Sequence, residues 1–499
     1  MGRAHIKLAW ALLALLLAAC SGQSSDSLPL TVVALRGTSP PLADWRSPPP
    51  PVLSVTASPA AQSSLSTATP APSVRTPTPA PSMPVLMLPA YQFSRDDLVL
   101  LNGEVVSDVL HVDTGLLTLV ENTTLPLALI PDSELVYGSA YANFDIAAFV
   151  DQHDGPLKSY RETVEGQVLS GAQVVEYVAR QYSVGPRVLL ALLEYSGGWV
   201  TRPSPDWVAS DFPVGHVNPQ WRGLQAQLTW ASNHLNFGYY GRKQRGVGAV
   251  RFADDTYTLV SPELNAGTVA VQIVLGLTRS YRGWEGAVSA RGFLATYRAL
   301  FGDPYQYDTS PPLPADLQQP LLELPWAADE TWYYSGGPHG GWGGGSAWAA
   351  VDFVPPGALS GCYDSETLVR ASAAGLVVRS QLGMVVVDLD GDGLEQTGWV
   401  LNYAHIARRE RVSAGTRLKT GDPIGHPSCE GGVSTGTHVH LTRRYNGEWV
   451  MAGSGPVPMV LAGWTVRQAH TAYDGEMVKG ERTLTAIAGR SQGNNDVTR

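Results

Sequence analysis

The sequence predicts a multidomain protein with a mostly helical middle domain and an antiparallel all-β C-terminal domain. Valines recur at helical spacing within residues 174–182, after a Ser170-Gly171 start signal, and Val188–Leu193 is an apolar run typical of a buried helix. Beyond residue 326 the pattern changes to short β-prone runs punctuated by glycine, which indicates antiparallel strands. A length of 499 residues leaves room for two or three domains, each with its own core.

Changes in composition along the chain predict its domain boundaries. Segments rich in Ser, Thr and Pro cannot bury enough apolar surface to offset their ordering entropy, so they are expected to be linkers. The expected segments are a signal peptide at 1–19, a Ser/Thr/Pro-rich linker at 20–89, a mostly helical domain at 90–310, a second linker at 311–325, a β domain at 326–470 and a C-terminal tail at 471–499.

The N-terminus predicts export from the cytoplasm. Arg3 and Lys7 precede the apolar run Leu8–Ala19, which has the length of a signal peptide and is short for a membrane span. The run ends in Leu-Ala-Ala-Cys, which resembles a bacterial lipobox, and this resemblance implies lipidation of Cys20. We therefore expect an extracytoplasmic lipoprotein, anchored to a membrane of the cell envelope.

The net charge indicates which partners to exclude, and the cysteine content bears on the compartment in which the protein is located. Lys plus Arg number 34 against 44 Asp plus Glu, and this net charge of −10 offers no field that would neutralise phosphates, so we expect no nucleic-acid partner. Apart from Cys20, the chain holds only Cys362 and Cys429. In an oxidising exterior these two are expected to form a disulfide, and two buried free thiols are the alternative.

Histidines mark a candidate metal site in the predicted β domain, which contains six of the eleven in the chain. His438 and His440 form a His-x-His pair, and both imidazoles can project into one cleft because alternate residues of a strand face the same side. Three further motifs precede this pair, and they contain His339, Asp352 and His405.

The order of these motifs resembles that of the lysostaphin-like zinc endopeptidases of bacterial cell walls, over about residues 326–450. Most of those enzymes carry the first ligand histidine four residues before the aspartate, where this sequence has Trp348. Their β-lytic branch carries it thirteen residues before the aspartate, across a glycine-rich loop, and His339 has this spacing from Asp352. The loop Gly340–Gly345 can bring His339 back towards the site because glycine tolerates the dihedral angles required.

The resemblance implies a role for each residue of the site. His339, Asp352 and His440 would be the protein ligands of Zn²⁺, which leaves a fourth tetrahedral position for water, as in catalytic zinc sites. His405 and His438 would act as general acid or base and as stabiliser of the oxyanion, without a decision as to which does which. The predicted function is that of a zinc-dependent metalloendopeptidase, which hydrolyses peptide bonds of peptidoglycan through a metal-activated water. The alternative is a catalytically inactive lipoprotein that binds the cell wall or activates a hydrolase.

The helical domain carries a second resemblance. Residues 182–199 resemble the active-site helix of lysozyme-like lytic transglycosylases, which implies a lysozyme-like fold. The catalytic glutamate of that family falls on Ser196, and Glu194 faces about 200° away around the helix. We therefore expect a non-catalytic domain; a bifunctional hydrolase would require Glu194 in a cleft. Four tryptophans are candidates for stacking on sugars: Trp199, Trp207, Trp221 and Trp230.

An acidic motif also precedes the strand expected at residues 399–403. Asp388, Asp390 and Asp392 alternate as at the start of a calcium loop. The position where such a loop needs its bidentate glutamate is Trp399, so we expect an acidic hairpin turn instead.

Overall fold

The computed structural model describes residues 85–87, 116–118, 120–357 and 359–499. The predicted signal peptide, Cys20 and nearly all of the linker at 20–89 lie outside the described residues. Among the residues that are described, no helix combines the length and apolar character needed to cross a membrane. Strand β1 (Val85–Met87) pairs antiparallel with β2 (Leu116–Thr118).

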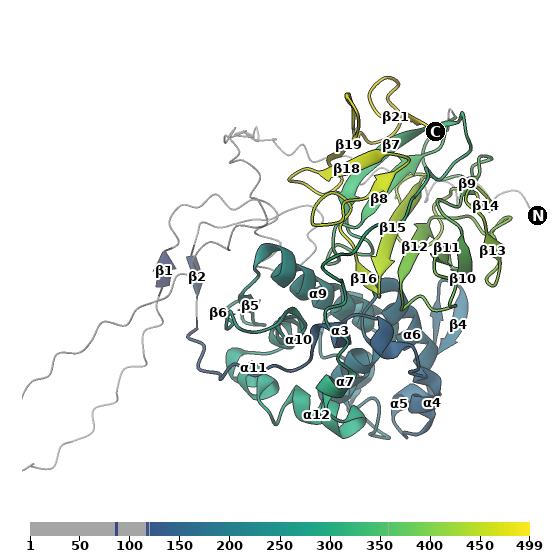
Figure 1. Ribbon diagram of the computed structural model, residues 1–499. Coiled ribbons are helices and arrows are strands. Elements are labelled where there is room, and N and C mark those ends of the chain that lie inside the picture. The colour runs from purple at the N-terminus through teal and green to yellow at the C-terminus, as the bar shows by residue number, and fades with distance from the viewer. Residues whose placement is uncertain (1–84, 88–115, 119, 358) are drawn as a thin grey trace, which may run out of the picture. The chain divides into compact units, whose positions relative to one another are not determined.

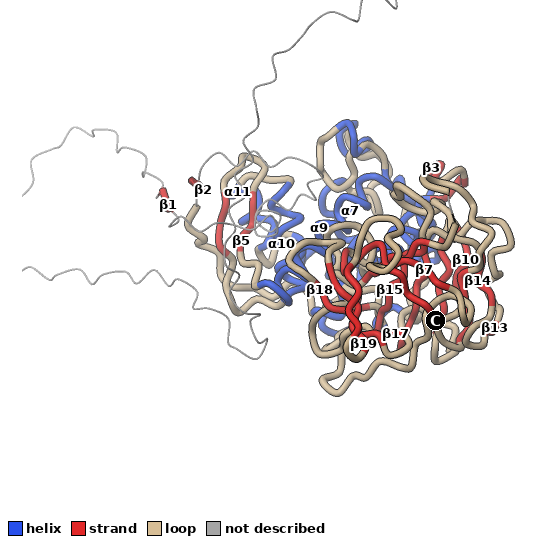
Figure 2. The backbone as a smooth tube through the Cα atoms, turned by 90° about the horizontal axis from the view of Figure 1, so that it is seen from above, coloured by secondary structure: helices blue, strands red, loops and turns tan. Residues whose placement is uncertain are grey.

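Helices dominate residues 132–307, and strands dominate residues 331–498 (Figures 1 and 2). The helices of the first part are α3 (Asp132–Leu135), α4 (Ile146–Asp151), α5 (Pro156–Ser159), α6 (Gly171–Tyr182), α7 (Pro186–Gly197), α8 (Trp207–Asp211), α9 (Leu224–Arg245), α10 (Ala266–Leu277), α11 (Tyr281–Val288) and α12 (Phe293–Phe301), with the 3-10 turns η1 (Ser139–Tyr141), η2 (Pro219–Trp221) and η3 (Pro304–Tyr307). Two short hairpins accompany them, β3 (Arg161–Val164) with β4 (Gln167–Ser170) and β5 (Ala249–Arg251) with β6 (Tyr257–Leu259).

The sequence accounts for the main helices. Ser170 caps α6 in a capping box with Gln173, in which each side chain bonds to the other residue's backbone N–H. Pro186 opens α7, where its missing N–H would have no partner in any case. The long α9 packs on α10, which is buried from Ala266 to Gly276. Gly238 permits the contact, because an added Cβ would lie 2.7 Å from the Cα of Ala270.

The second part is built on one antiparallel sheet. Its strands are β7 (Thr331–His339), β8 (Ala350–Val354), β10 (Gly375–Gln381), β11 (Met384–Asp388), β12 (Trp399–Ala404), β13 (Arg417–Leu418), β15 (Val439–Tyr445), β16 (Glu448–Trp449) and β21 (Asp496–Thr498). Their order is β13-β10-β11-β12-β15-β8-β7-β21, with β16 paired to β15. Smaller sheets contain β9 (Val369–Arg370) with β14 (Pro423–Gly425), and β17 (Val460–Leu461), β18 (Trp464–Gln468), β19 (Gly475–Lys479) and β20 (Arg482–Thr485). The prediction of an antiparallel β domain at the C-terminal side is confirmed.

The segment predicted as a tail, residues 471–499, differs from that expectation. It contains β19 and β20, and β21 pairs with β7 at the edge of the main sheet. Strands of three to five residues carry too little alternation to stand out in a sequence, which is why a tail was expected here. Residues 311–325, predicted as a linker, contain no helix or strand, yet Leu322 and Leu324 are buried in the β core.

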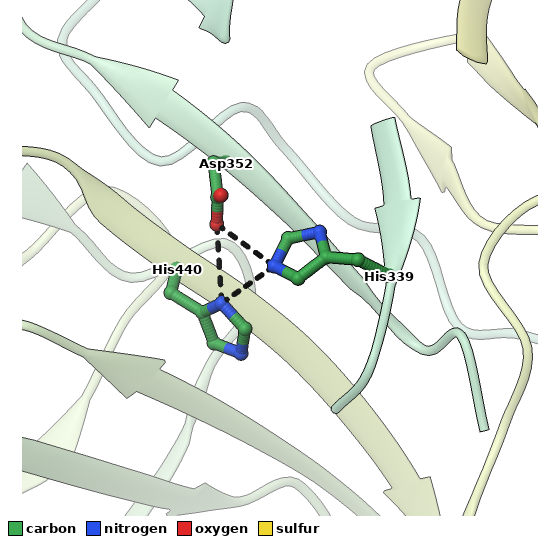
Figure 3. Close-up of side chains that lie close together, drawn as sticks. All are labelled: His339, Asp352 and His440. Carbon is green, nitrogen blue, oxygen red and sulfur yellow. Dashed lines mark hydrogen bonds and ion pairs between the residues drawn. The ribbon is translucent and has the colours of Figure 1, made fainter. Parts of the chain in front are cut away.

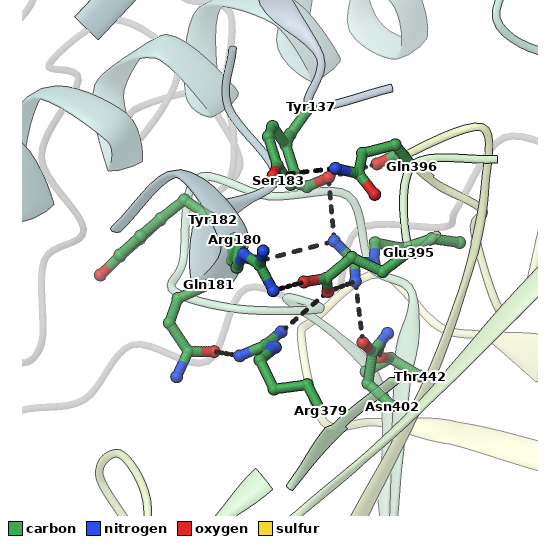
Figure 4. Close-up of polar contacts among 12 residues, drawn as sticks. Tyr137, Arg180, Gln181, Tyr182, Ser183, Arg379, Glu395, Gln396, Asn402 and Thr442 are labelled. Carbon is green, nitrogen blue, oxygen red and sulfur yellow. Dashed lines mark hydrogen bonds and ion pairs between the residues drawn. The ribbon is translucent and has the colours of Figure 1, made fainter. Parts of the chain in front are cut away.

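A buried cluster of charges joins the helical and β parts (Figure 4). Glu395, in the connection between β11 and β12, accepts hydrogen bonds from Arg379 and Arg444 of the sheet and from Arg180 of α6. Gln181 of α6 also accepts a hydrogen bond from Arg379. The two parts therefore share an interface that contains charged groups as well as apolar ones.

Candidate metal centre and active site

Strand register places two of the predicted metal ligands opposite each other. His440 on β15 pairs directly with Asp352 on β8, so the two side chains lie on the same face of the sheet. His339 is the last residue of the neighbouring β7, and its ring points towards the other two (Figure 3). Trp348, at the position where most lysostaphin-like enzymes carry their first ligand, is not part of this group.

The donor atoms of these three side chains converge. Nε2 of His339 lies 3.1 Å from Nδ1 of His440, and Oδ1 of Asp352 lies 3.1 Å from Nδ1 of His440 and 3.4 Å from Nε2 of His339. Two ligands bound tetrahedrally at zinc distances are about 3.3 Å apart, so the spacing fits one zinc ion.

The hydrogen bonds on the far side of each imidazole support the same conclusion. Nδ1 of His339 lies 2.8 Å from the carbonyl oxygen of Gly337, and Nε2 of His440 lies 3.0 Å from that of Gly341. A carbonyl only accepts, so each of these ring nitrogens carries the proton and the other one keeps its lone pair. Two lone pairs and the carboxylate of Asp352 then face one point with no donor among them, an arrangement that a cation satisfies.

Burial and neighbouring charges set the charge states of His339 and Asp352. Burial lowers the pKa of His339 to about 4, against the opposing effect of Asp352, so this imidazole is neutral at pH 7. For Asp352, burial alone would raise the pKa, but His339, His438 and His440 hold it well below its usual value. The site therefore presents neutral imidazole and ionised carboxylate, the forms that bind metals.

His405 and His438 stand beside the three converging residues. Their ring centroids are 4.5 Å apart, and Nε2 of His438 lies 3.7 Å from Oδ1 of Asp352. Nδ1 of His405 lies 3.1 Å from the carbonyl oxygen of Glu430, and Nδ1 of His438 lies 2.7 Å from that of Gly436. In the neutral form of each ring these contacts put the proton on Nδ1, so Nε2 is the nitrogen that can accept a proton.

The surroundings of His405 are unusual for a histidine. Its φ of +62° lies in the left-handed region, which non-glycine residues adopt rarely. Burial lowers its pKa to about 3, with His438 and His440 adding to the effect. This imidazole is therefore neutral over the whole physiological range.

The predicted disulfide between Cys362 and Cys429 is confirmed, and it braces the approach to the active-site strand. Thr437, next to His438, accepts a hydrogen bond from the backbone N–H of Tyr363 and donates one to the carbonyl oxygen of the same residue. The segment that carries His438 is thus bound to the segment that carries Cys362.

Tyr473 is a residue of the site that the sequence did not indicate. Its ring stacks on His339 with centroids 4.0 Å apart, while 57% of the residue stays exposed. Its φ of +71° is again in the left-handed region. Because it lies in the segment expected to be a tail, with no motif around it, only the folded arrangement identifies it.

In the helical part, Glu194 does not have the surroundings of a catalytic acid. Its carboxylate accepts hydrogen bonds from the backbone N–H groups of Val200 and Thr201 and from the hydroxyl of Thr201. It therefore closes the turn after α7. Of the four tryptophans considered for sugar stacking, Trp199 and Trp230 are buried in the core, and only Trp207 is largely exposed.

The acidic motif forms the turn after β11. Asp388 is buried, and its carboxylate accepts hydrogen bonds from the backbone N–H groups of Asp390, Gly391 and Gly393. These hydrogen bonds form the acidic turn that was expected.

The His-Asp-His cluster on the antiparallel sheet is a candidate metal site, and a family match identifies the C-terminal part as a metallopeptidase domain. A family model described as "Peptidase family M23" matches residues 361–452, and one described as "LasA, N-terminal domain" matches residues 128–314. The chain thus carries an M23 peptidase domain of the lysostaphin-like type, preceded by a LasA N-terminal domain, and it is a homologue of protease LasA. The predicted enzyme class, a zinc metalloendopeptidase, is supported. The upstream match is to the LasA domain, and the predicted lysozyme-like fold is not confirmed.

The relatives are similar over a large share of their length. The chain is 27% identical to protease LasA of two Pseudomonas aeruginosa strains, PAO1 and UCBPP-PA14, over 346 residues that cover 65% of this chain and 76% of that protein. Among solved structures, the M23 metalloprotease pseudoalterin, from the deep sea, is 22% identical, with 36% of this chain and 99% of that chain covered and a TM-score of 0.29. The catalytic domain of lysostaphin from Staphylococcus simulans is 25% identical, with coverage of 24% and 87% and a TM-score of 0.18.

Proposed function

We propose that this protein is a zinc-dependent endopeptidase that hydrolyses peptide bonds in bacterial cell-wall peptidoglycan. The observation that carries the proposal is the convergence of His339, Asp352 and His440 on one point, with the proton of each imidazole turned away from it. These three residues would hold the zinc ion. A bound zinc ion supplies Lewis-acid polarisation of the scissile carbonyl and lowers the pKa of a water molecule to about 7.

The two remaining histidines would move protons. His405 is neutral, and its Nε2 can accept the proton of the attacking water, because its Nδ1 already donates to the carbonyl of Glu430. His438 has the same orientation relative to Gly436, and it lies nearer to Asp352. Either one, once protonated, can donate to the oxyanion of the tetrahedral intermediate or to the leaving amine.

The proposed setting is outside the cytoplasm, with the chain tethered to a membrane through lipidated Cys20. The disulfide of Cys362 and Cys429 supports an oxidising compartment. Mass spectrometry of the protein isolated from membranes, with a Cys20→Ser variant beside it, tests the anchor. We expect the Cys20→Ser variant to fold but to lose its association with the membrane.

The function is tested on the purified protein with intact peptidoglycan. We expect about one zinc per chain by elemental mass spectrometry and the appearance of new amino termini in the digest. His339→Ala is expected to lose both, whereas His470→Ala, at an exposed histidine outside the site, is expected to lose neither. Zinc bound without cleavage would favour the inactive cell-wall-binding alternative, and absence of zinc would overturn the proposal.

A further inference from the structure

The glycine-rich loop, Gly340–Gly345, connects β7 to the segment before β8, and it lies directly on the helical part. The backbone N–H of Gly345 donates a 2.9 Å hydrogen bond to Oδ1 of Asn233 on α9. An added Cβ on Gly345 would lie 1.9 Å from the carbonyl oxygen of Asn233, so the loop backbone and the helix are in close contact. Any side chain at this glycine would push the loop away from α9.

The other end of the loop packs against Trp449, which also forms hydrogen bonds to the helical part. An added Cβ on Gly341 would lie 2.6 Å from the ring of Trp449. The indole N–H of Trp449 donates to the carbonyl oxygen of Tyr182, and its backbone N–H donates to the hydroxyl of Tyr240. The helical part therefore contacts the loop directly at Gly345 and, through Trp449 of β16, indirectly at Gly341.

Hydrogen bonds within the loop connect these two points. Ser346 accepts a hydrogen bond from the backbone N–H of Trp342 and donates one to the carbonyl oxygen of Gly343. The backbone N–H of Gly341 donates to the carbonyl oxygen of Ala347. A displacement at Gly345 would therefore move Gly341.

Gly341 is the residue through which the loop reaches the metal centre. Its carbonyl oxygen accepts the hydrogen bond of His440 Nε2 at 3.0 Å, and this bond leaves Nδ1 of His440 facing His339 and Asp352. Carbonyl partners of this kind fix the tautomer and the ring orientation of a ligand histidine, and their loss typically weakens metal binding about 10–100-fold.

We propose that Asn233 of the helical part is a positioning residue for the zinc centre of the β part. It holds the glycine-rich loop so that the carbonyl of Gly341 orients His440. The inference rests on the proposed function, since it requires a bound metal, and it gives the helical part a role in building the active site.

The experiment uses the full chain and four variants. Asn233→Ala and the nearly isosteric Asn233→Leu remove the acceptor, and the leucine variant serves if the alanine variant does not fold. Asn233→Asp keeps an acceptor for Gly345. Gln225→Ala is the control on the same helix, because the side chain of Gln225 bonds to Thr229 within α9. The measurements are Zn²⁺ affinity by competition with a chelating dye, the visible spectrum of the Co²⁺-loaded protein, and urea unfolding of the metal-free protein.

We expect the acceptor-less variants to bind Zn²⁺ about tenfold more weakly, near the lower end of the range for such partners. Their Co²⁺ absorption bands should shift or lose intensity, because the ring of His440 is no longer fixed. Asn233→Asp should restore affinity and spectrum, and Gln225→Ala should match the wild type. Wild-type affinity and spectrum in the acceptor-less variants would overturn the inference alone. A wild-type protein that binds neither metal would overturn the proposed function as well.

Discussion

Gly336 on β7 lies against the carboxylate of Asp352 so closely that a Cβ at residue 336 would be 2.6 Å from Oδ2 of Asp352. The same glycine is the register partner of Asp352 on β8. The absence of a side chain at this position is therefore what leaves room for the carboxylate in the metal centre.

Gly336→Ala is accordingly expected to weaken Zn²⁺ binding by about tenfold or more, because the new methyl group displaces Asp352 from the centre. The measurement is a metal titration of the chelator-treated protein. Gly286→Ala is the matched control, since a Cβ at Gly286 in α11 meets nothing within 4 Å, and helix propensity makes that variant slightly more stable. Equal affinities of the two variants would contradict the assigned role of Gly336.

His405→Ala separates proton transfer from metal binding. We expect it to retain zinc, because His405 is not among the three converging donors, and to lose peptidase activity by about 10²–10⁴-fold, the usual contribution of a general acid or base. Zinc content and the rate of peptide release, measured on the same preparation, distinguish a loss of proton transfer from a loss of metal. A variant that loses its zinc would instead make His405 a structural support of the centre.

Glu395 is expected to make the fold sensitive to acid. Burial alone would raise its pKa, but Arg379, Arg444 and Arg180 lower it from 4.5 to about 2. Between these two pH values the unfolded chain binds the proton and the folded chain does not, so the free energy of unfolding falls as the pH falls. At 1.36 kcal/mol per pH unit, the loss across this window is about 3 kcal/mol.

The matching variant is Glu395→Gln, which leaves Arg379 and Arg444 without a counter-charge, whereas Arg180 keeps its ion pair with Glu176. Its stability at pH 7 should drop by about 3–5 kcal/mol, and its urea unfolding should lose the acid-dependent part between pH 4.5 and 2. Glu366→Gln is the control, because Glu366 pairs with Arg409 at the surface. If the free energy of unfolding of Glu395→Gln depends on pH as in the wild type, Glu395 does not contribute to the acid sensitivity of the fold.

Replacing Cys362 and Cys429 together by serine is expected to lower the free energy of unfolding by about 4 kcal/mol, the chain-entropy estimate for the loop that the disulfide closes. Urea unfolding of the double variant gives this difference. Adding a reductant should lower the stability of the wild type by a similar amount and leave the variant unaffected. A wild type that is indifferent to a reductant that breaks the bond would contradict the expectation.

The sequence was sufficient for features that depend on local spacing. The motif spacing, read through the resemblance to the β-lytic enzymes, predicted the three residues His339, Asp352 and His440 that the structure brings together. The valine spacing after Ser170-Gly171 predicted a helix, which the structure shows as α6. These signals arise within one strand, one loop or one helix.

Contacts between distant segments could not be predicted where no motif or cysteine pair marks them. Tyr473 stacks on His339, and Asn233 reaches Gly345, with no motif around either Tyr473 or Asn233. The resemblance of residues 182–199 to a lysozyme helix was also a local pattern. It did not predict the turn after α7, in which the carboxylate of Glu194 accepts a hydrogen bond from the backbone N–H of Thr201.

The pairing of β21 with β7 has a consequence for biosynthesis. β7 ends at His339, whereas β21 begins at Asp496, so the ribosome must add the whole intervening chain before the outer edge of β7 acquires its partner. An unpaired edge strand is a template for association with other chains. Nascent or prematurely terminated chains that stop short of Asp496 therefore leave Thr331–Tyr333 without a partner strand, at the end of β7 away from His339, and we expect such chains to associate through this edge.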